Sequence, residues 1–125
     1  MKDITLQIAS SNSELTRVAT ALARDRVTLR AGVIVNTGRH FVTRFIPSNL
    51  DAARDALESA GVRFGEGEIV PVRLEARPGE LVRLISKLAA GGVGLRAIYV
   101  TSMSEHHLEI AVAPTNVARA MLALR

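Results

Sequence analysis

The sequence lacks cysteine and tryptophan, and its aromatic residues are one tyrosine and three phenylalanines among 125 residues. Without cysteine, the chain can form no disulfide, no thiolate metal site and no cysteine nucleophile. So few aromatic side chains also leave no base-stacking platform of the kind that RNA-recognition domains use. These absences narrow the function to classes that need neither thiol chemistry nor stacking on bases.

Long apolar segments are absent as well. No run approaches the roughly 18 apolar residues of a membrane-spanning helix, and residues 1–11 alternate as a strand does rather than as a signal peptide does. We therefore expect a cytoplasmic protein with no membrane partner.

The net charge of +4 comes from arginines that are spread along the chain. Nucleic-acid binding requires a concentrated basic patch, so we do not expect a nucleic-acid partner. A basic nucleic-acid-binding domain remains an alternative.

Motifs that carry catalysis are missing. The chain has no nucleophile elbow, phosphate loop or HExxH pattern, and nothing places serine, histidine and aspartate together. Of the three histidines, His106 and His107 are adjacent where a turn meets an expected strand, and adjacent strand residues point to opposite faces, so they do not share a metal ion easily. We expect no catalytic residue, no metal site and no cofactor, and hence no enzyme.

The sequence contains an internal repeat. A shift of 66 residues matches nine of the eighteen positions 14–31 without a gap, where chance gives roughly one or two. Examples are Leu22 with Leu88 and Arg30 with Arg96. After a one-residue insertion, Pro47 and Asn49 match Pro114 and Asn116. Two whole units, residues 1–66 and 67–125, are thus duplicated.

Each unit begins with a strand of period two and continues with an amphipathic helix. The alternating strand residues are Ile4, Leu6, Ile8 in the first unit and Val70, Val72, Leu74 in the second. Ser11 with Glu14 marks the start of the first helix, and Pro78 marks the start of its counterpart. Asp25 and the pair 91–92 mark the helix ends.

Two strands and a second helix follow. The strands are expected at 28–35 and 40–46, then at 95–102 and 107–113, with Ser48 and Thr115 as N-caps of the second helices. A fourth strand is expected only in the first unit, near 62–64, and residues 66–68 are the expected linker. The order predicts an α+β fold of duplicated ferredoxin-like βαββαβ units, with antiparallel sheets and helices on one face.

Two segments of the second unit point to a family. They are Arg77-Pro78-Gly79-Glu80-Leu81, after the opening strand, and Gly92-Val93-Gly94-Leu95, which enters the second strand. With the duplication, they make the chain resemble a tandem ACT domain protein over about 4–64 and 70–125. The resemblance implies regulation, because such modules pair side by side and bind an amino acid where one unit's first loop meets its neighbour.

The resemblance also implies the ligand-binding residues. In the first unit they are Ser10, Ser11, Asn12, Ser13, Glu14 and Thr28, and in the second unit Arg77, Pro78, Gly79, Glu80, Leu81 and Gly94. Gly79 would let a ligand carboxylate approach the amides of a helix N-terminus, and Glu80 or a strand-edge carbonyl could accept from the ligand's ammonium group. The first loop has asparagine and serine where the second has Pro-Gly, so one composite site, two sites or a lost site are all open. For the serines and Asn12, helix capping alone is the other interpretation.

We therefore expect a non-catalytic sensor that binds a free amino acid between two units, acts as a homodimer and regulates a metabolic enzyme in trans. The alternative from another class is a structural interaction module without a ligand.

Overall fold

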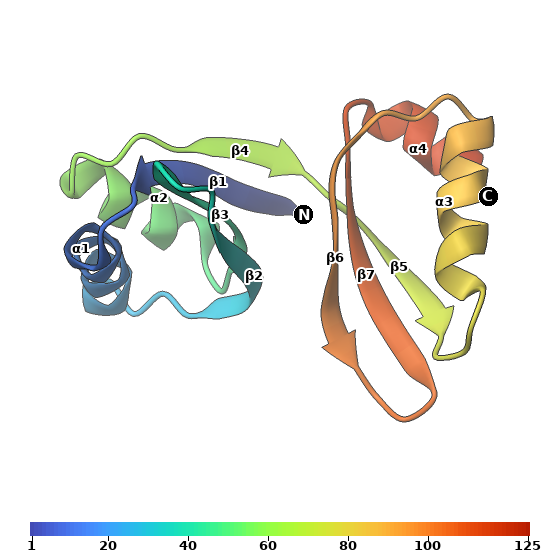
Figure 1. Cartoon of the computed structure of the whole chain (residues 1–125), viewed down its shortest axis with the longest axis horizontal. Helices are drawn as coiled ribbons and strands as arrows, with labels where there is room; N and C mark the ends of the chain where they lie inside the picture. The colour runs from blue at the N-terminus through green and yellow to red at the C-terminus, as the bar shows by residue number, and fades with distance from the viewer. The chain divides into compact units, whose positions relative to one another are not determined.

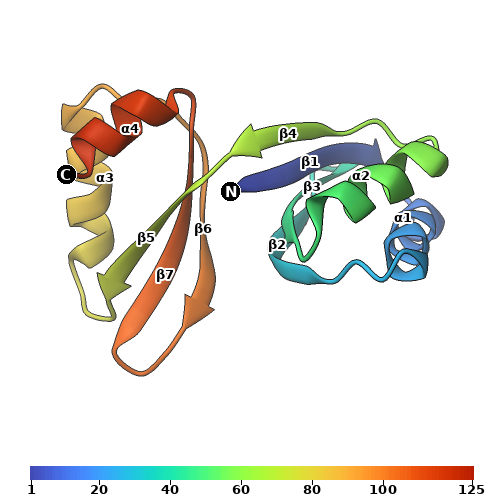
Figure 2. The ribbon, with the colours of Figure 1, turned by 180° about the vertical axis from the view of Figure 1, so that it is seen from behind.

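The computed structural model describes all residues, 1–125, and divides them into two compact units. The first unit comprises Lys2–Gly67, and the second comprises Glu68–Arg125 together with Met1. In each unit two helices cover one face of an antiparallel sheet (Figures 1 and 2). The expected α+β ferredoxin-like fold is confirmed.

The first unit contains a four-stranded sheet in the order β2-β3-β1-β4. Its elements are β1 (Lys2–Ala9), α1 (Asn12–Arg24), β2 (Leu29–Asn36), β3 (His40–Pro47), α2 (Leu50–Ser59) and β4 (Gly65–Glu68). In the register of this sheet, β3 lies between β1 and β2, so that Thr43 pairs with Leu6 on one side and with Ile34 on the other. The strand β2 therefore forms one edge of the sheet, and β4 forms the other.

The second unit repeats this plan with three strands, in the order β5-β7-β6. Its elements are β5 (Val70–Glu75), α3 (Glu80–Ala90), β6 (Leu95–Met103), β7 (His107–Pro114) and α4 (Val117–Ala123). The central strands of both units begin and end within one residue of the expected positions. The absence of a fourth strand from the second sheet is also as expected.

Each unit has its own hydrophobic core between the sheet and the helices. In the first unit, Ile4, Leu6 and Ile8 are at most 7% exposed and face Val18 and Leu57. The second core consists of equivalent residues, namely Val70, Leu84, Leu88, Val93, Ile110, Val112 and Ala120. Burying one such large side chain stabilises a fold by about 1.5–3 kcal/mol, which explains why the apolar periodicity determines the topology.

The helix N-caps agree with expectation at one position and differ at two. Ser11 caps α1, and its Oγ accepts a hydrogen bond from the amide of Glu14. The second helices are capped by Asn49 and Asn116, so the predictions of Ser48 and Thr115 were wrong. In each case the asparagine is one residue closer to the helix, and its side-chain oxygen reaches the amide three residues ahead.

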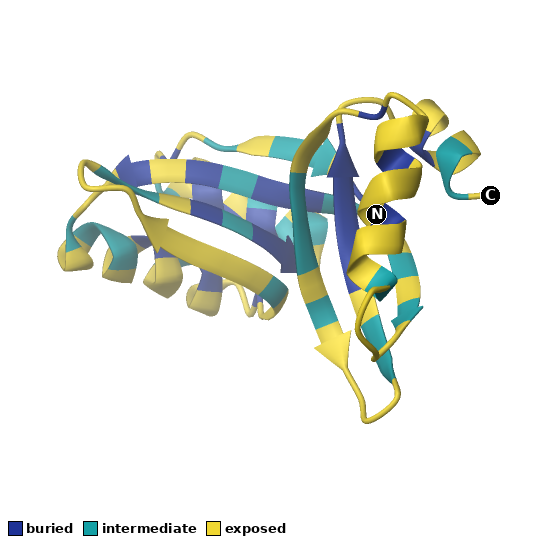
Figure 3. Cartoon of the chain, turned by 45° about the vertical axis from the view of Figure 1, so that its right-hand side comes forward, coloured by how far each residue is buried: buried dark blue, intermediate teal, exposed yellow.

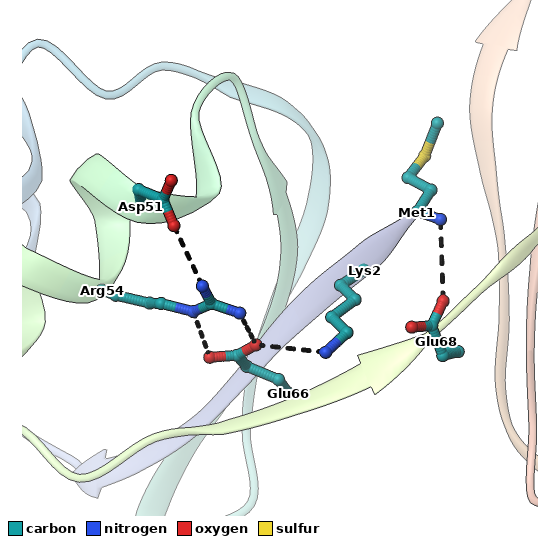
Figure 4. Close-up of polar contacts among 6 residues, drawn as sticks. All are labelled: Met1, Lys2, Asp51, Arg54, Glu66 and Glu68. Carbon is teal, nitrogen blue, oxygen red and sulfur yellow. Dashed lines mark hydrogen bonds and ion pairs between the residues drawn. The ribbon is translucent and has the colours of Figure 1, made fainter.

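The fourth strand lies later in the chain than the sequence predicts. The expected strand at 62–64 is a loop, and the expected linker at 66–68 belongs to β4. Glycine and glutamate have low strand propensity, which is why the sequence does not predict a strand here. The strand forms because tertiary contacts outweigh that propensity. Figure 4 shows the main contact, in which Arg54 of α2 binds the carboxylate of Glu66, with Lys2 of β1 3.9 Å away on its other side.

Candidate ligand-binding site

The loop between β5 and α3 is held on one side by the β6–β7 turn. The amide of Ala76 donates to the carbonyl of His106 at 2.8 Å, and the amide of Arg77 donates to the carbonyl of Glu75 at 2.9 Å. Gly79 then adopts a φ of +92°, a left-handed conformation that residues with a Cβ rarely accept. The loop geometry thus depends on glycine at this position.

The N-terminus of α3 is open. The helix begins at Glu80 with Gly79 as its N-cap, two residues beyond the start that Pro78 indicated, and no side chain caps its first turn. The amide of Glu80 reaches the carbonyl of Arg77 only at 3.5 Å, and the amide of Leu81 has no acceptor within the helix. A Cβ built on Gly79 would meet no atom within 4 Å. Free backbone amides and the positive end of the helix dipole are therefore accessible at the start of α3, and both favour the binding of a carboxylate.

Charged side chains surround this loop. The Nε of Arg77 lies 2.8 Å from Oε1 of Glu80 and 3.0 Å from Oε2 of Glu75. The hydrogen bond to Glu80, and then the charge of Glu75, raise the pKa of Arg77 above its ordinary value. Glu80 is only 12% exposed and also lies 3.5 Å from Arg83, whereas Glu75 is 58% exposed. Glu75 is therefore the more accessible acceptor for a ligand's ammonium group.

A cleft of about 290 Å³ lies beside the loop, lined by Glu75, Ala76, Arg77, His106 and His107. This volume is just below the range for drug-sized ligands, roughly 300–1,000 Å³, and suits a smaller molecule. The cleft combines a carboxylate, a guanidinium and two imidazoles. Such a set can bind both charged groups of a zwitterion.

The sequence had pointed to only part of this cleft. Arg77 lines it, whereas Pro78, Gly79 and Leu81 lie next to it around the helix start, and Glu80 lines a separate hollow of about 210 Å³. From the sequence, His106 and His107 are candidates only for metal binding, and their place in this cleft is not predicted. Their place here follows from the pairing of Glu75 with His107, which brings the β6–β7 turn against the loop.

In the first unit, the corresponding loop uses its polar side chains internally. The Oγ atoms of Ser11 and Ser13 are 2.8 Å apart, and the Oγ of Ser10 donates to Oδ1 of Asn36 at 3.2 Å. Asn12 is the first residue of α1. Ser11 is thus a helix cap, as the alternative interpretation of this loop has it. Asn36 is a further polar residue there that the sequence did not single out.

Glu14, in the first turn of α1, pairs with Arg17, two of whose nitrogens donate to its carboxylate at 3.3 and 3.1 Å. The hydrogen bond, and then the charge of Arg17, lower the pKa of Glu14. Glu14 is therefore ionised at neutral pH and already occupied by an arginine, as Glu80 is in the second unit.

Thr28 and Gly94, the predicted site residues just before β2 and β6, lie far from the loops that precede α1 and α3. Thr28 exchanges hydrogen bonds with Ser48, and the carbonyl of Gly94 accepts from Thr115, so both lie where the central strand ends. The loops that begin at Ser10 and Ala76 lie where the central strand begins, about 23 Å away for an eight-residue strand. Within a single unit, Thr28 and Gly94 are therefore not brought together with the loops.

The structure contains neither a cluster of metal-ligating side chains nor a membrane-spanning helix. No three side chains among the histidines, aspartates and glutamates are grouped so that they could hold a metal ion. None of the helices combines the length and the apolar character needed to cross a membrane.

No family model and no curated protein matches the sequence. Solved structures do match the fold. A protein from Bacteroides thetaiotaomicron superposes with a TM-score of 0.87 at 23% identity, over 98% of this chain and 85% of that one. The ligand-free regulatory subunit of aspartate kinase from Thermus thermophilus gives a TM-score of 0.68 at 17% identity, over 98% and 89% of the two chains.

A longer protein also contains the fold. Aspartate kinase from Clostridium acetobutylicum, described as an allosteric enzyme, matches 98% of this chain with a TM-score of 0.63 and 13% identity, and the match spans 32% of that enzyme. The fold that the resemblance to tandem ACT domain proteins predicted is therefore the one that is observed.

Proposed function

We propose that the chain is a non-catalytic cytoplasmic sensor of a free amino acid that regulates an enzyme of amino-acid metabolism. One observation carries the proposal: the uncapped helix start at Gly79 lies beside a cleft with groups of both charges. The fold supports it, because similar structures include a regulatory subunit of aspartate kinase and part of an allosteric aspartate kinase.

The two charged groups of an amino acid have complementary partners around this loop. Its carboxylate would accept from the amide of Leu81 and from Arg77, where the positive end of the helix dipole adds to the attraction. Its ammonium group would donate to Glu75, the more exposed of the two glutamates that pair with Arg77. The side chain of the amino acid would then extend along the cleft towards His106 and His107.

A neighbouring unit would complete such a site. When two edge strands pair side by side in antiparallel fashion, the start of one strand lies beside the end of the other. Thr28 or Gly94 of one unit then approaches the first loop of the other, which a single unit does not permit. A homodimer therefore fits the predicted residues better than an isolated unit does.

Regulation follows if the amino acid contacts both units. A ligand shifts an equilibrium only by the difference between its affinities for the two states, so contacts with both units favour the paired arrangement. The regulated enzyme would respond to that shift. We expect this enzyme to make or consume the amino acid that is bound.

A thermal-shift screen of the twenty amino acids at millimolar concentration tests the proposal. We expect one amino acid, or a small chemical group of them, to raise the melting temperature, because a ligand at 100 times its Kd stabilises a fold by about 2.7 kcal/mol. An unchanged melting temperature with all twenty would instead support an interaction module without a ligand.

A further inference from the structure

A cleft of about 410 Å³ lies beside the part of β1 that β4 does not reach. Strand β1 has eight residues and β4 has four, and the two run antiparallel as neighbours in the sheet (Figure 1). The residues before β4 therefore do not continue the sheet along the rest of β1. The cleft lies within the first unit, and the residues that line it include Thr5, Gln7, His40, Arg63, Phe64 and Gly65.

The backbone of Gln7 is directed into this gap. The amide of Ser10 donates to the carbonyl of Arg39 at 3.1 Å, so these two residues form a hydrogen-bonded pair in the register of β1 and β3. Bonded and non-bonded pairs alternate along an antiparallel ladder, and Gln7 therefore belongs to a non-bonded pair with β3. No backbone hydrogen bond joins Gln7 to residues 62–64 on the other side of the gap. The amide of Gln7 is thus available to an acceptor in the cleft.

Polar side chains from two strands meet on one face of the sheet at this cleft. Buried residues alternate with more accessible ones along β1 (Figure 3). The buried ones face the core, so Thr5 and Gln7 lie on the face that the helices do not cover. His40 of β3 is opposite Ala9 and therefore lies on this same face. Arg63 reaches the cleft from the loop before β4.

The donors at this cleft are unused within the chain. The hydroxyl of Thr5, the imidazole of His40 and the guanidinium of Arg63 make no hydrogen bond or ion pair with another residue, and neither does the side-chain amide of Gln7. No aspartate or glutamate lines the cleft. Hydrogen-bond donors that include a guanidinium and meet no carboxylate favour an anionic ligand.

We propose that this cleft binds the phosphate group of a small metabolite. A phosphate monoester presents three terminal oxygens, one more than a carboxylate, and the donors in the cleft match the larger number. The guanidinium of Arg63 binds two of these oxygens through parallel hydrogen bonds. The third accepts from the imidazole of His40 and from the amide of Gln7, with the hydroxyl of Thr5 beside them.

The cleft also has room for the organic part of such a molecule. Its volume of about 410 Å³ falls within the range for small-molecule sites, roughly 300–1,000 Å³, and a phosphate ion alone fills little of it. Phe64 is half-buried and packs against the core of the first unit, so it forms an apolar wall of the cleft. The loop at Gly79 belongs to the other unit, and the proposal requires no bound amino acid.

Two arginines form a matched pair for the test. Arg63 and Arg96 are both exposed, and neither makes an ion pair. Arg96 is on β6, outside the cleft. R63A and R96A therefore remove the same charge from the protein, and only R63A removes a donor from the cleft. R63K keeps the charge and loses the two-point contact.

A nuclear magnetic resonance titration of the full chain at constant ionic strength tests the proposal, with glycerol 3-phosphate, inorganic phosphate and acetate as probes. We expect glycerol 3-phosphate to shift the amide signals of Gln7, Arg63 and Gly65 to saturation. Binding should be weaker by about tenfold or more in R63A, intermediate in R63K and unchanged in R96A, because a hydrogen bond to a charged group contributes about 1.5–3 kcal/mol. Acetate should bind about tenfold more weakly than glycerol 3-phosphate.

Three results would each overturn the proposal. Shifts that never saturate, or equal weakening in R63A and R96A, would mean that only the general positive charge attracts the anion. Acetate that binds as tightly as glycerol 3-phosphate would exclude a phosphate site. Saturable binding of inorganic phosphate without binding of glycerol 3-phosphate would exclude a phosphorylated metabolite.

The helix start at Gly79 is a second place where an anion could bind, and G79A separates the two sites. We expect G79A to bind glycerol 3-phosphate as wild type does, and R63A to retain the binding of an amino acid. If phosphate binding were lost in G79A and kept in R63A, the phosphate would lie at α3 and the proposal would fail. The absence of any amino-acid binding would refute the sensor and leave this site intact.

Discussion

The guanidinium of Arg54 binds the carboxylate of Glu66 through two parallel hydrogen bonds, 2.6 Å from Nη2 to Oε1 and 2.7 Å from Nε to Oε2. This bidentate pair joins α2 to β4, a strand whose own composition does not favour a sheet (Figure 4). This contact adds to the hydrogen bonding of β4 with β1 in holding the fourth strand of the first unit.

Replacing Glu66 by glutamine should lower the melting temperature of the first unit, because the charged two-point contact with Arg54 is lost. The matched control is D51N, which removes a single 3.0 Å bond to the same arginine from a side chain that is 88% exposed. Calorimetry should show a larger decrease for E66Q than for D51N. Equal decreases would mean that β4 does not depend on this pair.

The same contact predicts a dependence on pH. The hydrogen bond from Arg54, and then its charge, lower the pKa of Glu66 below the ordinary value of 4.5. A carboxyl whose pKa is depressed by folding contributes stability above its unfolded pKa, and that stability is lost as the pH falls through the folded value. The difference in melting temperature between wild type and E66Q should be constant from pH 7 to about pH 5 and should decrease below that. A difference that grows on acidification would contradict this origin.

Gly32 should not tolerate alanine. Its φ is ordinary, but a Cβ there would lie 2.7 Å from Cβ of Phe45 and 2.8 Å from the carbonyl oxygen of Arg44. Overpacking of this kind typically costs about 1–3 kcal/mol. Urea unfolding of G32A measures the cost, with G61A as a comparison in which a positive φ strains the backbone but no atom is near. If G32A proved as stable as wild type, β2 and β3 would have to move apart easily.

The cap of α2 can be tested at a single position. Alanine at Asn49 removes the acceptor for the amide of Ala52 and should destabilise the first unit by about 1 kcal/mol, whereas aspartate should preserve the cap. The free energy of unfolding of both variants, taken from urea titrations, checks this. Similar decreases in the free energy of unfolding for N49A and N49D would show that the side-chain oxygen at this position does not stabilise α2.

The sequence predicted the fold well because the repeat and the apolar period carry most of the information. Ile4, Leu6 and Ile8 alternate as they must when one face of a sheet is buried, and their counterparts do the same 66 residues later. The N-caps were misassigned because two suitable residues are adjacent, serine or threonine and then asparagine. Propensity does not decide which of two neighbours lies at the helix start.

Other features depended on contacts between distant residues. Strand β4 was missed because Gly65 and Gly67 resemble a linker, whereas the pairing of β4 with β1 and the contact of Arg54 with Glu66 hold the segment extended. The cleft at Arg77 was incompletely predicted, since His106 and His107 reach it through the register of β5 and β7. The sequence also did not show that Thr28 lies at the opposite end of its sheet from Ser10.

Calorimetric titration with the amino acid that gives the largest thermal shift tests the central claim most directly, with G79A and G38A as a matched pair. Both glycines have positive φ, at +92° and +101°, and neither has an atom within 4 Å of an added Cβ, so the backbone strain is comparable. The account predicts at least tenfold weaker binding for G79A and unchanged binding for G38A. Equal affinity in both variants and wild type would show that no amino acid binds at the start of α3.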